Sequence, residues 1–197
     1  MKRLIAFAGQ MGSGKSYAAD YLCREFGYTR VKFASPLKDM LRTLGLTEAH
    51  IEGELKNKPC ELLCGKTPRW AMQTLGTEWG RDLIGNGLWG NIWQQRVEAL
   101  LRQNLPVVVD DCRFKDEAER VRRMGGTVVL LLDLSQKPDE THSSEVIDVG
   151  PCMVIDNTAK DSNRLIESLT ATVLGIESAV LHDEDNGNPE QPNGCGH

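Results

Sequence analysis

A short glycine-rich segment near the start of the chain limits its possible folds more than any other feature. Residues 9–16 read Gly-Gln-Met-Gly-Ser-Gly-Lys-Ser, which matches the pattern G-x-x-x-x-G-K-[ST]. The apolar run 4–8 before it predicts a buried strand, and residues 14–26 after it have helical periodicity. A strand, a glycine-rich turn and a helix in this order form a phosphate-binding loop at the edge of a parallel sheet.

The residue types in this loop each have a physical reason. Glycine lets the backbone curl so that its N–H groups point at phosphate oxygens, and the helix that follows adds its positive end. We predict that Lys15 contacts the β- and γ-phosphates of ATP and that the Ser16 hydroxyl ligates Mg²⁺. The other predicted contacts to ATP are Gly9, Gly12, Ser13 and Gly14.

The rest of the chain alternates apolar strands with helices, which predicts a three-layer α/β/α fold with a mainly parallel central sheet of about five strands. The further expected strands are 31–34, 106–109, 127–132 and 152–155. The further expected helices are 35–44, 67–75, 91–103, 115–124 and 161–174. Ser35 is expected to cap its helix, and residues 46–66 have no clear pattern.

Two carboxylates follow the apolar strand 106–109 directly. Asp110 and Asp111 are expected at the carboxyl edge of the sheet, beside the phosphate-binding loop, as candidate Mg²⁺ ligands. Arg113 follows on the same turn and is the first candidate, ahead of Arg120, Arg122 and Arg123, for the guanidinium that acts on the transferred phosphoryl group. The alternative is a solvated pair of acids that caps the next helix.

A tryptophan-rich segment holds the candidates for a second substrate. Arg69 and Arg81 lie within it and Lys38 lies before it, and such cations can clamp a phosphate. Trp70 or Trp79 can stack on a base whose edge Gln73 reads. The alternative is that the tryptophans only pack in the core, with the arginines in solvent.

Charge and composition exclude some classes of protein. The net charge is −5, but five of the 28 acidic residues fall after residue 174, where there is no Lys or Arg, so the body of the chain is neutral. No apolar run approaches the ~20 residues that cross a bilayer. The six scattered cysteines indicate free thiols in a reducing compartment. The net charge of the whole chain does not decide its partner. We expect a cytoplasmic protein without membrane or direct nucleic-acid binding.

Four further segments, read together with the glycine-rich loop, carry a family resemblance. They are residues 33–38 (Phe-Ala-Ser-Pro-Leu-Lys), 75–81 (Leu-Gly-Thr-Glu-Trp-Gly-Arg), 109–114 (Val-Asp-Asp-Cys-Arg-Phe) and 142–145 (His-Ser-Ser-Glu). With them, residues 4–174 resemble the bacteriophage-type deoxynucleoside monophosphate kinases, a branch of the P-loop kinases. The resemblance implies transfer of the ATP γ-phosphoryl group to a deoxynucleoside monophosphate (dNMP), with Mg²⁺.

The resemblance also implies roles for single residues. Asp111, Arg113 and Glu117 match the family's aspartate-arginine-glutamate motif, and Trp79 and Arg81 match its acceptor motif. Lys15, Arg113 and Asp111 are thus the expected catalytic residues. The expected substrate contacts are Lys38, Arg69, Gln73, Trp79, Arg81, Glu117, His142 and Glu145. For His142 a purely structural role in the lid stays open.

A domain plan follows from the same resemblance. We expect a kinase domain over residues 1–182, an acceptor-binding helical insert near 46–104 and a short lid near 135–150. Residues 183–197 predict a disordered acidic tail. Related kinases favour a homodimer, in the host cytoplasm if a phage encodes the chain. The alternatives are another small-molecule P-loop kinase, such as a dephospho-coenzyme A or phosphomevalonate kinase, and a non-catalytic nucleotide-dependent switch.

Overall fold

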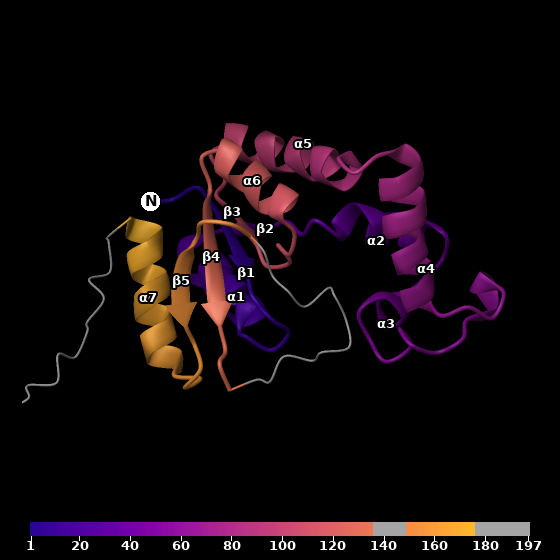
Figure 1. Ribbon diagram of the computed structural model, residues 1–197, viewed down its shortest axis with the longest axis horizontal. Coiled ribbons are helices and arrows are strands. Elements are labelled where there is room, and N and C mark those ends of the chain that lie inside the picture. The colour runs from indigo at the N-terminus through magenta and orange to yellow at the C-terminus, as the bar shows by residue number, and fades with distance from the viewer. Residues whose placement is uncertain (136–148, 176–197) are drawn as a thin grey trace, which may run out of the picture.

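The central sheet has five strands, all parallel, in the order β2-β3-β1-β4-β5 (Figure 1). The computed structural model describes residues 1–135 and 149–175. The strands are β1 (Leu4–Ala8), β2 (Thr29–Arg30), β3 (Val107–Val109), β4 (Thr127–Leu132) and β5 (Met153–Asp156). In the centre, Ala6 of β1 pairs with Val109 on one side and with Val128 on the other.

Helices cover both faces of the sheet, because β1, β3 and β4 are apolar on both sides. Helices α1 (Lys15–Phe26) and α7 (Ser162–Leu174) pack on the face that carries Ile5 and Phe7. Helices α5 (Leu88–Arg102) and α6 (Lys115–Arg123) pack on the face that carries Leu4 and Ala6. The predicted three-layer α/β/α fold with a parallel sheet of five strands is confirmed.

The remaining helices form a lobe beside the sheet (Figure 1). They are α2 (Ser35–Thr43), α3 (Glu48–Ile51), the 3₁₀ helix η1 (Glu61–Leu63), α4 (Pro68–Thr74) and the π-helix η2 (Leu75–Ile84). The lobe has its own small core around Leu41, Leu46 and Ile51. Helix α5, which lies within the expected insert near 46–104, packs on the sheet through Trp93 and Val97 and also contacts α2 and η2 of the lobe.

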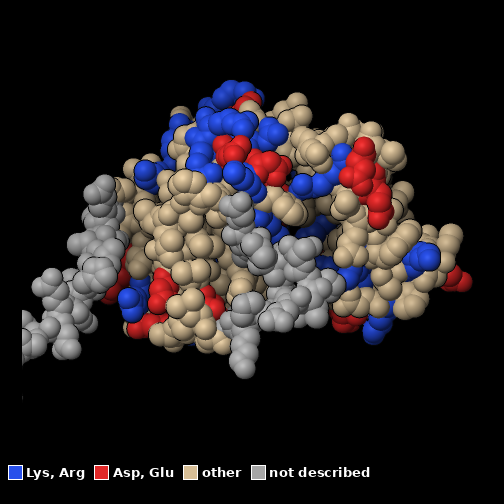
Figure 2. Space-filling model, in the orientation of Figure 1, with Lys and Arg blue, Asp and Glu red and all other residues tan. Residues whose placement is uncertain are grey.

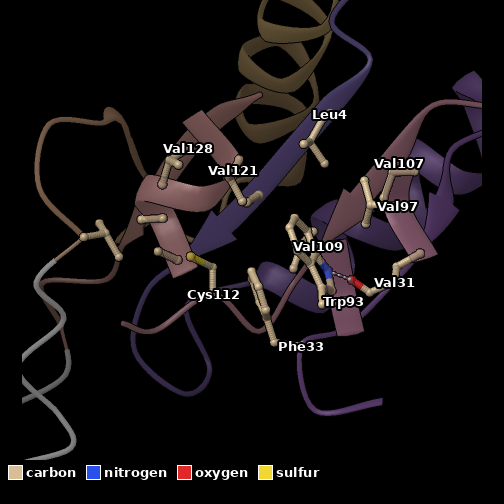
Figure 3. Packing of buried hydrophobic residues seen from close by; sticks show 14 residues of the cluster. Leu4, Val31, Phe33, Trp93, Val97, Val107, Val109, Cys112, Val121 and Val128 are labelled. Atoms are coloured by element: carbon tan, nitrogen blue, oxygen red, sulfur yellow. Dashed lines mark hydrogen bonds between the residues drawn. The ribbon is translucent and has the colours of Figure 1, made fainter. Parts of the chain in front are cut away.

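The second strand is shorter and earlier than predicted. The ladder on β3 ends at Val31, whose N–H donates to Val108 O at 3.0 Å. The next apolar residue, Phe33, is buried and stacks on Trp93 with ring centroids 4.2 Å apart. The Trp93 indole N–H donates to Val31 O at 3.2 Å, the dashed line in Figure 3. The apolar pattern of 31–34 therefore reflects core packing rather than strand pairing.

Two helix starts test the capping predictions. The predicted start of a helix at 67 is close to the observed start of α4, where Thr67 is the N-cap and its hydroxyl accepts from Trp70 N–H at 3.1 Å. The expectation for α2 was wrong, because Ala34 is the N-cap and Ser35 is the first helical residue. The described helices include none that is long and apolar enough to cross a membrane. Most of the expected lid and all of the expected acidic tail lie outside the described residues.

Candidate active site

The glycine-rich loop runs from the end of β1 to the start of α1, and its backbone needs glycine. Gly9, Gly12 and Gly14 have φ angles of +142°, +81° and +99°. A Cβ atom on Gly9 would lie 2.4 Å from Leu131 O, and one on Gly14 would lie 2.6 Å from the Asn157 Nδ2 atom. Both the backbone angles and the space therefore exclude larger residues here.

Lys15 is folded back over this loop. Its Nζ donates to Gly9 O at 2.8 Å and to Gln10 O at 2.6 Å. Burial, followed by the positive charge of Arg113, lowers the pKa of Lys15 to about 8, although Asp110 acts in the opposite direction. The Lys15 amine and the nearby Arg113 charge therefore form a positive site that an anionic ligand would stabilise.

Three polar residues support the loop from the carboxyl ends of β4 and β5. Asn157 Nδ2 donates to Ser13 O at 3.0 Å. Lys160 Nζ donates to Gly12 O at 2.9 Å and to the buried Asp133 carboxylate at 2.6 Å. Sequence reasoning missed these residues, although Asp133 follows the predicted strand 127–132 directly and Asn157 lies two residues after the predicted strand 152–155. A pocket of about 170 Å³ opens here, lined by Gly12, Gly14, Tyr17, Asn157, Lys160, Ser162 and Leu165.

The two adjacent aspartates have different surroundings. Asp110 is buried, and its Oδ2 lies 3.3 Å from the Ser16 hydroxyl and 3.6 Å from Lys32 Nζ. Asp111 instead accepts from Phe33 N–H at 2.9 Å and from Ala34 N–H at 3.0 Å, and burial raises its pKa. Asp110 therefore faces the glycine-rich loop, while Asp111 fixes the chain that leads into α2.

Asp110 also has an unused oxygen. Among the residues that the structure describes, Asp110 Oδ1 is buried without a hydrogen-bond partner. A buried carboxylate oxygen is costly unless something pairs with it. Hydroxyl and carboxylate oxygens are ligands for Mg²⁺, either directly or through the water molecules that it keeps. Ser16 and Asp110 therefore fit a Mg²⁺ ion bound beside the loop.

A second group of cations lies between the sheet and the lobe. Lys38 forms an ion pair with Glu52. Burial acts to raise the pKa of Glu52, but the positive charges of Lys38, Lys32 and Lys56 outweigh this effect and lower the pKa. The pKa of Lys56 is lowered, first by burial and then by nearby positive charges that include Lys38, Arg69 and Arg113. Figure 2 shows blue side chains in the hollow between the two parts of the molecule. Cations far apart in the sequence thus converge here.

Arg113 connects the two groups of cations. Its charge lowers the pKa of Lys15 in the loop and that of Lys56 in the lobe. Both effects are coulombic, and such effects fade over roughly 8–10 Å in salt solution. Arg113 is therefore near enough to both Lys15 and Lys56 for its charge to act on each of them.

Comparison with known proteins identifies the family. A protein of Acanthamoeba polyphaga mimivirus, described as a "Putative deoxynucleotide monophosphate kinase", is 35% identical over 155 residues, covering 73% of this chain and 80% of its own length. The chain belongs to the deoxynucleotide monophosphate kinase family. It is therefore a kinase, an enzyme of the phosphotransferase class.

Two further comparisons give an uncharacterized relative and a solved structure with a similar fold. An uncharacterized protein of Ictalurid herpesvirus 1, ORF76, is 29% identical over 146 residues, and these cover 72% of this chain but 54% of that protein. A "putative kinase" of known structure from Chloroflexus aurantiacus shares the fold, with a TM-score of 0.50 and 11% identity over 89% of this chain and 98% of that one. No family model matches the chain.

Glu117 organises the start of α6 in this kinase. Its Oε2 accepts from Arg113 N–H at 2.9 Å and from Phe114 N–H at 3.2 Å, and its Oε1 lies 3.6 Å from the Arg81 guanidinium. That guanidinium lies over the Phe114 ring, 4.3 Å from its centroid. One buried carboxylate thus positions both the Arg113 backbone and Arg81.

The structure places the other predicted substrate residues as follows. Trp79 lies on η2 with 38% of its surface exposed, and its ring centroid is 6.1 Å from that of the buried Trp89. Trp70 is more exposed and packs under the Lys66 amine instead. Gln73 lies on α4 with its side chain exposed. His142 and Glu145 lie outside the described residues.

Glu117 gives a testable pH dependence. Burial raises its pKa from 4.5 to about 7. Between these pH values the unfolded chain loses this proton before the folded one, so the free energy of unfolding falls as the pH rises. The full loss is on the order of 3 kcal/mol and is complete above about pH 7. Glu117→Gln has no such proton to lose. We therefore expect the free energy of unfolding of the variant, relative to that of wild type, to rise by this amount between about pH 4.5 and pH 7.

Urea denaturation of both proteins at a series of pH values measures the difference. Glu54→Gln removes an exposed carboxyl of the lobe and is the matched control, whose curve should run parallel to wild type. A Glu117→Gln curve that also runs parallel would show that Glu117 titrates normally in the folded protein.

Proposed function

We propose that this kinase transfers the γ-phosphoryl group of ATP to a dNMP and forms the corresponding diphosphate. The observation that carries the proposal is Lys15 folded over the glycine-rich loop, with Arg113 close enough for its charge to act on both Lys15 and Lys56. A reaction between two phosphorylated substrates requires a site for each phosphate and a cation between them. The kinship with a protein described as a deoxynucleotide monophosphate kinase supports this choice of acceptor.

The glycine-rich loop is the proposed site for the phosphates of ATP. Loop N–H groups and the start of α1 face the phosphates, and Lys15 exchanges its contacts with Gly9 O and Gln10 O for phosphate oxygens. A phosphate beside Lys15 favours the charged amine and restores the pKa that burial has lowered. The adjoining pocket of about 170 Å³ beside Asn157 and Lys160 would take the rest of the ATP molecule.

Ser16 and Asp110 are the proposed holders of Mg²⁺. When bound, this ion neutralises charge on the phosphates of ATP. Asp111 has both carboxylate oxygens on backbone N–H groups, so we propose that it positions the chain before α2 rather than contacting the metal. Asp111 then contributes to catalysis indirectly, because the segment that it holds carries Lys32 and Lys38 toward the hollow.

The acceptor site is proposed in the hollow. Lys38, Lys56 and Arg69 supply positive charge for the dNMP phosphate, and Glu52 holds the Lys38 amine in place. Arg81 and Trp79 would bound the nucleoside, with Gln73 at the edge of its base. No general base is needed, because the attacking phosphate oxygen is already ionised at neutral pH.

The chemical step is a direct in-line displacement. An oxygen of the acceptor phosphate forms a bond to the γ-phosphorus as the bond from that phosphorus to the bridging oxygen of ADP breaks. Lys15 and Arg113 hold positive charge against the oxygens of the transferred group. In an infected cell, we propose, this reaction would supply DNA precursors.

A panel of acceptors tests the proposal. We expect ADP release from ATP to rise at least about tenfold over the rate without acceptor when a deoxynucleoside monophosphate is added. The panel contains the four common deoxynucleoside monophosphates, their ribose counterparts, dephospho-coenzyme A and phosphomevalonate.

Two outcomes of this panel would contradict the proposal. Stimulation by dephospho-coenzyme A or phosphomevalonate alone would assign the chain to another class of small-molecule kinase. Binding of ATP without stimulation by any acceptor would favour a nucleotide-dependent switch.

A further inference from the structure

A cavity of about 570 Å³ lies between α5 and α6, and the proposed reaction makes no use of it. Its lining residues are Gln94, Glu98, Leu101, Arg102, Arg120, Arg123 and Met124. A volume of this size is in the range of pockets that hold small-molecule ligands. We call this cavity the α5–α6 pocket.

The α5–α6 pocket is remote from the glycine-rich loop. The loop follows the carboxyl end of β1, whereas Arg102 and Arg123 end the helices that lead into the amino ends of β3 and β4. In a parallel sheet these ends lie at opposite edges. Figure 1 shows α5 and α6 at the top of the view, whereas the arrowheads of β4 and β5 point to the bottom.

Arg120 is fixed at the pocket by neutral groups rather than by acids. Its Nη1 donates to Asn91 Oδ1 at 3.0 Å and to Gln94 Oε1 at 2.9 Å. A Cβ atom on Gly90 would lie 2.5 Å from Arg120 Nε, so this glycine makes room for the guanidinium against α5. The two amide oxygens orient the guanidinium but leave its positive charge without a neutralising partner among the described contacts.

Further positive charge surrounds Arg120. Arg102 and Arg123 stand at the rim, each largely exposed, 3.9 Å from Glu98 and 3.0 Å from Glu119 respectively. Glu98 also accepts from Gln94 Nε2 at 2.7 Å and is the acid of the lining. Figure 2 shows blue side chains gathered over α5 and α6 at the top of the molecule. The pocket therefore favours a ligand with several negative charges.

The floor of the pocket is apolar. Leu101 and Met124 are partly buried and pack against the core cluster on this face of the sheet. Methionine adapts its shape to flat ring systems and makes favourable sulfur contacts with them. An apolar floor beneath three guanidinium groups suits a ligand with an aromatic part and a chain of phosphates.

We propose that the α5–α6 pocket binds a nucleoside triphosphate at a site separate from the active site. Arg102, Arg120 and Arg123 contact its phosphates, and Leu101 and Met124 contact its base. The proposal concerns binding alone and does not rest on the proposed acceptor. It stands even where the acceptor panel favours another kinase reaction.

Nuclear magnetic resonance with dATP as the probe tests the proposal in the full chain. The Lys15→Ala background weakens binding at the glycine-rich loop. We expect saturable shifts at the backbone amides of Leu101, Arg123 and Met124 as dATP is added. Shifts confined to residues around the loop and the hollow would overturn the proposal.

A pair of double variants makes the test specific. Arg102→Gln with Arg123→Gln removes two charges from the pocket, and Arg24→Gln with Lys2→Gln removes two exposed charges elsewhere. We expect the first pair, and not the second, to raise the dissociation constant at this site at least about tenfold, because phosphate–guanidinium contacts are charge-assisted. Equal affinities in both double variants would overturn the proposal.

Inorganic tripolyphosphate separates the two parts of the ligand. We expect it to bind this pocket more weakly than dATP, because it has no base to place on Leu101 and Met124. If tripolyphosphate binds as tightly as dATP, the pocket is a polyphosphate site and the nucleoside part of the proposal is wrong.

Discussion

Lys15→Ala is expected to lower kcat for phosphoryl transfer by about 10²–10³-fold. The Lys15 amine is the cation of the glycine-rich loop, and transition-state charge develops on the oxygens that it faces. Its contacts in the free protein are two loop carbonyl oxygens, Gly9 O and Gln10 O. Neither contact joins the layers of the fold, so the variant should keep the thermal stability of wild type to within a few degrees.

Steady-state rates of ADP release and a thermal melt together check this expectation. Lys2→Ala is the matched control, since it removes an exposed amine of the same kind at the opposite edge of the sheet. Retention of more than about a third of the wild-type kcat by Lys15→Ala would contradict the mechanism. A parallel fall in the melting temperature would instead assign Lys15 a structural role.

Gly9→Ala is expected to cost about 3–5 kcal/mol of folding free energy. The backbone at Gly9 has a φ of +142°, where residues with a Cβ atom are strained. The new methyl group would also lie 2.4 Å from Leu131 O. That carbonyl belongs to β4, which pairs with β1 through Ala8 and Leu130, so it cannot move without disturbing the centre of the sheet.

Gly65→Ala separates the two causes of this loss. Gly65 also has a positive φ, +80°, but a Cβ atom there would meet nothing within 4 Å. This control therefore measures backbone strain alone, about 1–2 kcal/mol. Urea denaturation gives both values. Equal losses in the two variants would show that the loop shifts to accept the methyl group and that the contact with β4 is unimportant.

The sequence predicts local features of this molecule well because their causes are local. The glycine-rich loop is defined by neighbouring residues, and the runs 4–8 and 127–132 are apolar on both faces, as strands of a covered sheet must be. Thr67 and Pro68 likewise start α4 from within one turn. These elements can be predicted without knowing which distant residues they contact.

The prediction from sequence fails where contacts with distant residues determine the local structure. The run 31–34 resembles a strand, but the amides of Phe33 and Ala34 donate to Asp111, which lies 77 residues or more along the chain. The π-helix η2 has no simple pattern of its own, and Gly80 there makes room for the Trp89 indole. Such pairings follow from the assembled fold.

The candidate site was predictable in its parts but not in its arrangement. Lys38, Arg69 and Arg113 were chosen as cations, yet nothing in the sequence places them around Lys56 or shows Lys56 to be one of them. Both aspartates were expected to bind Mg²⁺, and Asp111 alone was also expected to be catalytic, whereas the turn after β3 directs Asp110 to Ser16 and Asp111 to α2. Side-chain direction after a strand depends on backbone turns that composition does not encode.

The strand order has a consequence for how the chain folds during synthesis. Strand β1 is central, yet its partners β3 and β4 begin only at Val107 and Thr127. At roughly 5–20 residues per second, a ribosome takes on the order of 5–20 s to reach the first of them. Through that interval the apolar segment Leu4–Ala8 has no strand to pair with. We therefore expect nascent chains of this kinase to expose an apolar segment that chaperones can bind for longer than the modest size of the domain suggests.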